Sequence, residues 1–397
     1  MKKGRRNYRE IIKEAEEKER KKQGEEMDLS DDMNYFFAEQ MRRSWGPVSR
    51  SGRIWIVPDN DLESKTIIEL LQRRGEIYYV TRQQWGASWD MLEPEIFEQL
   101  SEDGFEVDSE QVSLLRKYDE EIEAYREELN SISDDPERKK ELEEAIEVAT
   151  ADRKRLASDM IASINTQAEG MNKTVYGVEL QGSSRGATNI DHHIYGDDDR
   201  SNPKSSIEQV GEITWTDLSL DERFVAANDK GYIPEMERLG HELGINEEDL
   251  QEIISNIRMR DREAQGVTPE QELQVAEAVE KLGEIKGKKK FIRIRLPHSK
   301  TSTVTDRLYG KYENLLITSD NGETNFFGAT EIINMLNEEF KEVDKEGRSN
   351  CWSGGQLDQG SGFWGGCVDQ YQVVSFLRNI FERENGHRPD PLPSDLI

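Results

Sequence analysis

The chain has 397 residues, of which 34% are apolar and 34% are charged, and its formal net charge is −29. This length predicts two or three domains that each bury a core. The acidic balance argues against a broad nucleic-acid-binding surface, because such surfaces attract phosphates with Lys and Arg. No stretch has the length of an apolar membrane span and no secretory signal opens the chain, so we expect a cytoplasmic protein that binds no membrane. Reduced thiols are expected at Cys351 and Cys367, with a disulfide as the alternative.

Residues 1–48 mix both charge signs at high density. This composition predicts a charged tail, either a solvated helix or a disordered segment. Its Lys and Arg residues could touch nucleic acid, but the interleaved glutamates favour a plain tail. We therefore expect the first folded domain to begin near residue 49.

The first folded domain begins with a strand, an acidic loop and a helix. The apolar run at 54–57 predicts a buried strand, and it leads into a loop that contains Asp59 and Asp61. Apolar side chains then recur at helical spacing up to Gly75, and residues 76–81 supply the next strand. This order predicts an α/β fold with a doubly wound, mostly parallel sheet.

Residues 108–167 form an insertion in this domain. Apolar residues at helical spacing lie on both sides of a polar turn that contains Pro136, which predicts an antiparallel helical hairpin. Packing within one chain is the simpler interpretation of this apolar stripe. The alternative is that the hairpin projects as an arm and pairs with a second copy. We expect the protein to be a homo-oligomer, and the hairpin is the candidate interface.

A second group of side chains that can bind metal lies farther along the chain. Asp191, His192 and His193 follow a short run at 186–190. Two imidazoles and a carboxylate at the end of such a run can hold a divalent cation, and an open α/β sheet places its ligands at that edge. Alone, the triplet is more often a surface turn with a helix cap.

The segment after the triplet predicts the start of a helix. Ser205, Ser206 and Glu208 have the spacing of a capping box, whose simplest role is to begin that helix. The exposed amides at such a start could also receive a phosphate oxygen, and Arg200 and Lys204 flank them.

A linker helix is expected between two domains. The first domain covers residues 49–265, and Thr268 with Pro269 would begin a helix within 266–287. This helix would lead to a smaller α/β domain at 288–397.

The C-terminal domain carries candidate substrate-binding residues. It begins with an alternating strand at 291–296, and this strand and the following turn supply Arg293, Arg295, His298 and Lys300. These groups could approach an anionic substrate or form an ordinary solvated strand face, and the two possibilities are about equal.

A glycine-rich segment lies near the end of the chain. It contains Gly354, Gly355, Gly362, Phe363, Trp364, Gly365 and Gly366. Its glycines would let the backbone approach a ligand closely, and its aromatic rings offer faces on which a base can stack. A tight structural turn is the alternative interpretation.

Together these motifs resemble the DHH phosphoesterase superfamily over about residues 50–390. The superfamily includes single-strand exonucleases, nano-oligonucleotide phosphatases, cyclic-dinucleotide phosphodiesterases and manganese pyrophosphatases. Its first motif, Asp-x-Asp after a strand, is similar to Asp59 and Asp61, and its third is similar to residues 191–193. Its fourth motif, an aspartate in a small-residue stretch, is similar to the surroundings of Asp229. The glycine-rich segment resembles that of the C-terminal substrate domain in this superfamily.

Two positions depart from the pattern of the superfamily. Many members have a histidine four residues before the first aspartate, and this chain has Trp55 there. The bridging aspartate of the second motif is replaced by Glu179, at the end of the predicted strand 174–178. Because an indole cannot ligate a metal, we expect one of two metal positions to be weak.

The resemblance implies two Mn²⁺ or Mg²⁺ ions at the edge of the sheet. One ion would be held by Asp59, Glu179 and Asp229, and the other by Asp61, Glu179 and His192. Two cations that share a carboxylate can bridge the attacking and leaving oxygens of a phosphodiester and activate a water.

The resemblance also assigns roles around the metals. His193 would face the scissile phosphate, Asp191 would orient an imidazole, and Arg200 would contact substrate with the C-terminal residues named above. The expected function is hydrolysis of phosphodiester bonds in a short oligonucleotide or a linear or cyclic dinucleotide. The alternatives are a phosphomonoesterase or pyrophosphatase, and a non-catalytic nucleotide sensor or scaffold with a degenerate site.

Overall fold

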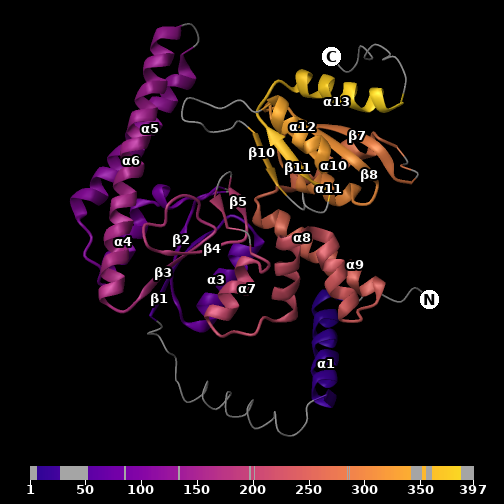
Figure 1. Cartoon of the computed structure of the whole chain (residues 1–397), viewed down its shortest axis with the longest axis horizontal. Coiled ribbons are helices and arrows are strands. Elements are labelled where there is room, and N and C mark those ends of the chain that lie inside the picture. The colour runs from indigo at the N-terminus through magenta and orange to yellow at the C-terminus, as the bar shows by residue number, and fades with distance from the viewer. Residues whose placement is uncertain are drawn as a thin grey trace. The chain divides into compact units, whose positions relative to one another are not determined.

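A computed structural model of the chain consists of two compact units, Met1–Gln265 and Gly266–Ile397 (Figure 1). The units contain a parallel sheet and a mixed sheet respectively, which confirms the predicted α/β class. Among the residues that the structure describes, no helix is both long and apolar enough to cross a membrane. The described residues are 7–26, 52–84, 86–132, 135–195, 198–200, 202–283, 285, 287–340, 351–354 and 360–385.

Each unit combines helices with strands. The first unit contains α1 (Tyr8–Glu26), β1 (Arg53–Pro58), α3 (Leu62–Arg74), β2 (Ile77–Thr81), η1 (Trp89–Met91), α4 (Pro94–Glu102), α5 (Ser109–Ser131), α6 (Pro136–Gly170), β3 (Thr174–Val178), β4 (Thr188–Ile190), β5 (Ile194–Tyr195), β6 (Asp198–Asp199), α7 (Ser206–Ile213), α8 (Leu220–Glu242) and α9 (Glu247–Ala264). The second unit contains α10 (Pro269–Glu280), β7 (Lys289–Leu296), α11 (Ser302–Leu308), β8 (Tyr312–Ser319), β9 (Thr324–Ala329), α12 (Thr330–Phe340), β10 (Cys351–Gly354), β11 (Ser361–Gly366) and α13 (Gln370–Asn385).

The first unit is built on a parallel sheet with strand order β2-β1-β3-β4. Side chains of β1 alternate between two cores: Ile54 and Ile56 pack with α4, α5 and α6, whereas Trp55 and Val57 pack with α3 and α7. A strand that is covered on both faces needs apolar residues at every position, and this explains the continuous apolar run in β1. The carboxyl ends of the four strands lie at one edge of the sheet.

The insertion forms a helical hairpin in which α5 and α6 lie side by side (Figure 1). Its apolar stripe is buried where the helices meet, at Ile122 on α5 and at Leu142 and Ala149 on α6. At the base of the hairpin, the buried Arg153 pairs with Asp119 at 2.9 Å. Packing within one chain therefore accounts for the stripe, and assembly through the hairpin stays a prediction.

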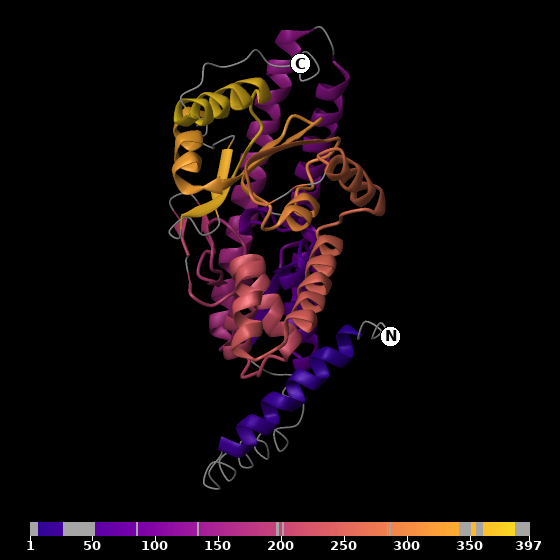
Figure 2. The same ribbon diagram turned by 90° about the vertical axis from the view of Figure 1, so that its right-hand side faces the viewer.

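The expected N-terminal tail contains a helix at residues 8–26, which is one of the two predicted alternatives, but this helix is packed and not fully solvated. Both Ile11 and Ile12 are buried in α1, which contacts α8 and α9 (Figures 1 and 2). Glu19 of α1 also pairs with Arg223 of α8 at 2.8 Å. The high charge density of this segment predicted that it is solvated. Two adjacent isoleucines within a charged run are too weak a signal to predict packing from the sequence.

The second unit contains a mixed sheet with strand order β10-β11-β9-β8-β7, in which only the β7–β8 pair is parallel. The expected linker helix belongs to this unit: Val275 of α10 is fully buried against Ile292 and Ile294 of β7. Its start at Thr268 and Pro269 was predicted, but its apolar contact with a later strand was not. Cys351 and Cys367 are both free thiols.

Gly177 in β3 gives a test of the core beneath the sheet edge. A β-carbon at this position would lie 2.1 Å from the ring of the buried Trp89. We expect Gly177→Ala to destabilise the protein by about 1–3 kcal/mol, because the indole must move. Gly170→Ala near the end of α6 is the control, since no heavy atom lies within 4 Å of its added carbon. Urea unfolding measures both variants, and equal stabilities would contradict the packing of Trp89 against β3.

Candidate metal centre

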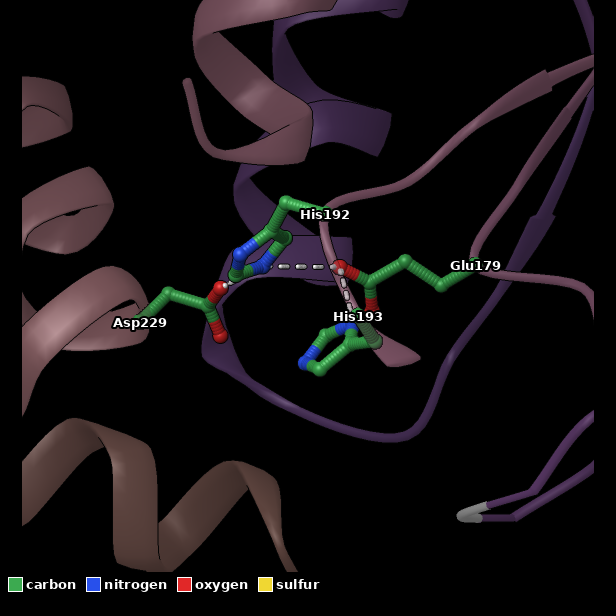
Figure 3. A group of neighbouring side chains, drawn as sticks. All are labelled: Glu179, His192, His193 and Asp229. Atoms are coloured by element: carbon green, nitrogen blue, oxygen red, sulfur yellow. Dashed lines mark ion pairs between the residues drawn. The ribbon is translucent and has the colours of Figure 1, made fainter. Parts of the chain in front are cut away.

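Four side chains converge at the carboxyl edge of the parallel sheet (Figure 3). Glu179 follows β3, His192 and His193 follow β4, and Asp229 lies on α8. One nitrogen or oxygen atom from each residue lies within 4.8 Å of the others. Carboxylate oxygens and imidazole nitrogens are the donors that Mg²⁺, Mn²⁺ and related divalent ions use, so this group could hold a metal.

His192 lies between the two carboxylates. Its Nε2 atom is 3.7 Å from Oε1 of Glu179 and 2.5 Å from Oδ2 of Asp229, a contact that lacks the angles of a hydrogen bond. Nδ1 of His193 is 4.0 Å from Oε1 of Glu179. The side chain of His193 is 42% exposed, whereas those of His192 and Glu179 are 9% and 8% exposed. His193 is therefore the member of the group that an incoming ligand can reach most easily.

Glu179 is held in an unfavourable backbone conformation. Its φ angle is +51°, in the left-handed region that a side chain with a β-carbon rarely adopts. Its N–H donates to the carbonyl oxygen of Ile190 at 2.9 Å, and its Oε1 accepts from Oγ of Ser206 at 2.8 Å. Burial and the charge of Asp229 raise the pKa of Glu179. Contacts with β4 and α7 thus hold this carboxylate at the edge of the sheet, although the backbone conformation of Glu179 is strained.

Asp191 organises the turn that carries both histidines. Its Oδ1 accepts from the N–H groups of His192 at 2.8 Å and His193 at 3.0 Å, and it lies 3.0 Å from Nδ1 of His193. Burial alone would raise the pKa of Asp191, but the hydrogen bonds from His193 hold it below its ordinary value. Burial alone would lower the pKa of His193, but Asp191, Glu179 and Asp229 raise it to about 9. This arrangement matches the expected orienting role of Asp191.

Asp229 is positioned by a kinked part of α8. The kink lies at Gly231 and Tyr232, and Tyr232 has a φ angle of +58°. The guanidinium of Arg258 lies 4.5 Å from the Tyr232 ring centroid and donates to Asn228 Oδ1 at 2.8 Å. Burial would raise the pKa of Asp229, but the neighbouring histidine rings lower it. A buried arginine on α9 therefore supports the helical segment that presents this carboxylate.

Two acidic residues at the start of α3 lie beside the same group. Asp61 caps the helix by accepting from the Ser64 N–H at 2.8 Å, and burial together with the charges of Glu179 and Asp229 raises its pKa. Glu63 is 2% exposed, and burial and the same two charges raise its pKa as well. Sequence reasoning identified Asp61 but missed Glu63. The only sequence signal was an acidic residue in the first turn of an amphipathic helix, and such residues usually face solvent.

The structure does not bring Asp59, an expected ligand of the first metal position, into the converging group, and it places Trp55 in the core. Asp59 lies outside the converging group: its side chain is 48% exposed, and its Oδ1 is 3.7 Å from Nζ of Lys65. Trp55 lies within β1 and is fully buried, with its ring stacked on Tyr176 at 4.5 Å and its Nε1 donating to Glu76. Position 55, where many DHH phosphoesterases have a histidine, is therefore part of the hydrophobic core in this chain.

Arg200 makes structural contacts and also lines a cavity, and its expected role as a substrate contact stays a prediction. Its guanidinium donates to the carbonyl oxygens of Leu180 and Gly182, and lies 3.5 Å from Oδ2 of Asp191. A cavity of about 590 Å³ lies beside it. Its wall includes the polar side chains of Ser183, Ser184, Asn189, Asp191, Asn202 and Gln209. Lys204 is paired with Glu212.

The basic candidates of the C-terminal strand lie in the second unit. Arg293 is half-buried, and burial and the neighbouring Arg295 lower its pKa. Both arginines line a cavity of about 440 Å³ together with Lys281 and Asp320. Nδ1 of His298 accepts from the Lys300 N–H at 3.1 Å, and burial lowers the pKa of His298.

The described residues of the glycine-rich segment lie mainly in β10 and β11. Gly354 of β10 pairs with Phe363 of β11, and Gly362 pairs with Gly328 of β9. A β-carbon on Gly365 would lie 2.3 Å from Nε1 of Trp352, and one on Gly366 would lie 2.9 Å from Sγ of Cys351. Trp364 is fully buried. Gly365 and Gly366 therefore make room for neighbouring side chains, and Gly355 lies outside the described residues.

Three buried atoms of the four converging residues and of the neighbouring Glu63 have the character of metal ligands. Glu63 Oε2, His192 Nε2 and Asp229 Oδ2 are buried atoms without a hydrogen-bond partner among the described residues. Buried polar atoms are normally satisfied, so atoms of this kind that face one point fit a bound cation. Comparisons with protein-family models, curated proteins and solved structures find no match. Function is therefore inferred from the chemistry of the site.

The buried carboxylates predict how the metal-free protein responds to pH. Glu63 and Glu179 have pKa values above their ordinary value of 4.5, so the folded state binds more protons than the unfolded state above that pH. The free energy of unfolding should therefore fall as pH rises through this window. We expect the Tm in EDTA to fall between about pH 5 and about pH 8, and to fall less steeply in Glu63→Gln. Identical slopes for the two proteins would contradict the burial of an ionisable Glu63.

Proposed function

We propose that this protein is a phosphoesterase that uses Mn²⁺ or Mg²⁺ to hydrolyse phosphodiester bonds in short oligonucleotides or in linear or cyclic dinucleotides. The observation that carries the proposal is the convergence of Glu179, His192, His193 and Asp229 within 4.8 Å at the carboxyl edge of a parallel sheet. A divalent cation in such a site offsets the charge of the phosphate and lowers the pKa of water. Stabilisation of the phosphate charge and proton transfer then depend on the side chains of this protein.

His193 is the residue that we assign to the reacting phosphate. Asp191 binds its Nδ1 at 3.0 Å and thereby fixes the ring, which remains partly exposed. In the metal-free protein, Asp191, Glu179 and Asp229 raise its pKa to about 9, so the ring is cationic at neutral pH before a metal binds. A cationic imidazole can stabilise charge that develops on a phosphate oxygen and can deliver a proton to the leaving oxygen.

Two properties support a short substrate. The formal net charge of −29 opposes the approach of a long polyanion, because each additional phosphate adds repulsion. The cavity beside Asp191 has about 590 Å³ of space and a wall of hydroxyl and amide groups, including Ser183, Ser184 and Asn202. Such groups can form hydrogen bonds with the ribose or base of one nucleoside, and the cavity has the size of a small-molecule site.

A non-catalytic nucleotide-binding protein is the second candidate, and the position of Asp59 favours it. An exposed Asp59 paired with Lys65 leaves one expected ligand out of the metal group. A site with fewer ligands can retain nucleotide binding after hydrolysis is lost. Turnover measurements separate the two candidates directly.

The proposed hydrolysis requires the metal-binding side chains Glu179, His192, His193 and Asp229. We expect hydrolysis of a dinucleotide or cyclic dinucleotide with Mn²⁺ and none with EDTA, and Asp229→Asn or His192→Ala should lower kcat by more than about 100-fold. Glu242→Gln on the exposed part of α8 is the control and should retain full activity. A panel that also contains p-nitrophenyl phosphate and pyrophosphate distinguishes a diesterase from a monoesterase or pyrophosphatase. Full activity in Asp229→Asn would exclude the site, and nucleotide binding without any turnover would support the second candidate.

A further inference from the structure

The first turn of α3 directs a buried carboxylate into the metal group. Glu63 is 2% exposed, and its Oε1 accepts a hydrogen bond of 2.9 Å from the N–H of Ile207 at the start of α7. This hydrogen bond fixes the carboxylate between two helices. Its other oxygen, Oε2, is buried and has no hydrogen-bond partner among the described residues.

The carboxyl group of Glu63 lies close enough to those of Glu179 and Asp229 to interact with both, although Glu63 is not one of the four residues whose ligand atoms lie within 4.8 Å of one another. Within the described parts of the chain, no lysine or arginine forms an ion pair with any of these three carboxylates. Buried carboxylates in such proximity repel each other unless protons or a cation compensate their charge. The buried Oε2 of Glu63 has no hydrogen-bond partner among the described residues, and Oδ2 of Asp229 contacts only His192 Nε2, so the two oxygens are well suited to share a cation.

Of the acidic residues at 59–63, Glu63 alone has a buried oxygen without a hydrogen-bond partner among the described residues. Asp59 is on the surface with Lys65, and Asp61 uses Oδ1 to cap the N–H of Ser64. Trp55 supplies no ligand atom and lies in the core. Glu63 is thus the side chain of the β1–α3 segment whose buried oxygen remains available to the group.

We propose that Glu63 is a direct metal ligand that acts with Glu179 and Asp229, and that it replaces the ligands lost at Trp55 and Asp59. This inference rests on the proposed metal-dependent function. It names a residue that neither the Asp-x-Asp motif nor the Asp-His-His motif contains. A third carboxylate also favours hard cations such as Mn²⁺ and Mg²⁺ at this site, because these ions prefer oxygen ligands.

A protonated Glu63 that only donates a hydrogen bond to Glu179 is the competing explanation. Glu63→Gln separates the two roles, because glutamine keeps the shape, the acceptor for Ile207 and an N–H donor, but removes the negative charge. A hydrogen-bonding role predicts an unchanged metal affinity in this variant. A ligand role predicts weaker metal binding and, without metal, a Tm that is equal to or higher than that of the wild type.

The test is a calorimetric titration of the full-length, EDTA-treated protein with Mn²⁺. We expect Glu63→Gln to weaken Mn²⁺ binding by about tenfold or more, or to abolish binding of one ion, and to reduce the rise in Tm that Mn²⁺ causes. Glu69→Gln, at an exposed position of the same helix, is the control and should bind Mn²⁺ as the wild type does. If Glu63→Gln does not fold, Glu63→Asp retains the charge with a shorter reach and should also bind Mn²⁺ more weakly than the control.

Unchanged Mn²⁺ affinity in Glu63→Gln would overturn the inference, and a loss in Asp59→Asn instead would assign the ligand to Asp59. The Mn²⁺ affinity is measured without any substrate, so it does not depend on whether the protein is an active enzyme. If the wild type hydrolyses phosphodiesters while Glu63→Gln binds Mn²⁺ normally, the inference fails and the proposed function stands. If the wild type binds Mn²⁺ through Glu63 but hydrolyses no phosphoester, the proposed function fails and the metal ligand stands.

Discussion

Repulsion among buried carboxylates is the constraint on which the candidate site depends. Asp61, Glu63 and Glu179 all have raised pKa values because they are buried and because neighbouring negative charges disfavour ionisation. Only the two histidines bring compensating positive charge into direct contact with the group, within the part of the chain that the structure describes. A divalent cation would remove this repulsion and would add the Lewis acidity that phosphoester hydrolysis requires.

The surrounding fold holds these groups in place before any ligand arrives. The carbonyl oxygen of Ile190 binds the strained backbone of Glu179, and Ser206 binds its carboxylate. Arg200 ties the Asp191 turn to the carbonyl groups that follow β3. Arg258 supports α8 beside Asp229. Each of these contacts joins segments that are distant in the sequence, so the site depends on the complete first unit and not on a local motif.

The strands and helices near the site were largely predictable, because their signals are local. The apolar run of β1 and the Gly75 stop of α3 appear in the sequence, and both are present in the structure. The capping box at Ser205 is also present, with Glu208 completing it. The convergence of Glu179, His192 and Asp229 was predictable only by resemblance, since their spacing in the sequence does not bring them together.

The errors share a physical origin in tertiary contacts. Glu63 was missed because its burial depends on how α3 packs against α7, and an acidic residue in a first turn usually lies at the surface. Asp59 has the same charge and a similar sequence context, yet it pairs with Lys65 outside the group.

Anomalous diffraction from a crystal grown with Mn²⁺ locates the ion without any assumption about substrate. We expect a strong anomalous peak among Glu179, His192 and Asp229, where the candidate ligand atoms already lie within 4.8 Å of each other. The absence of any peak there at saturating Mn²⁺, with these side chains still in their present positions, would contradict the proposed metal site.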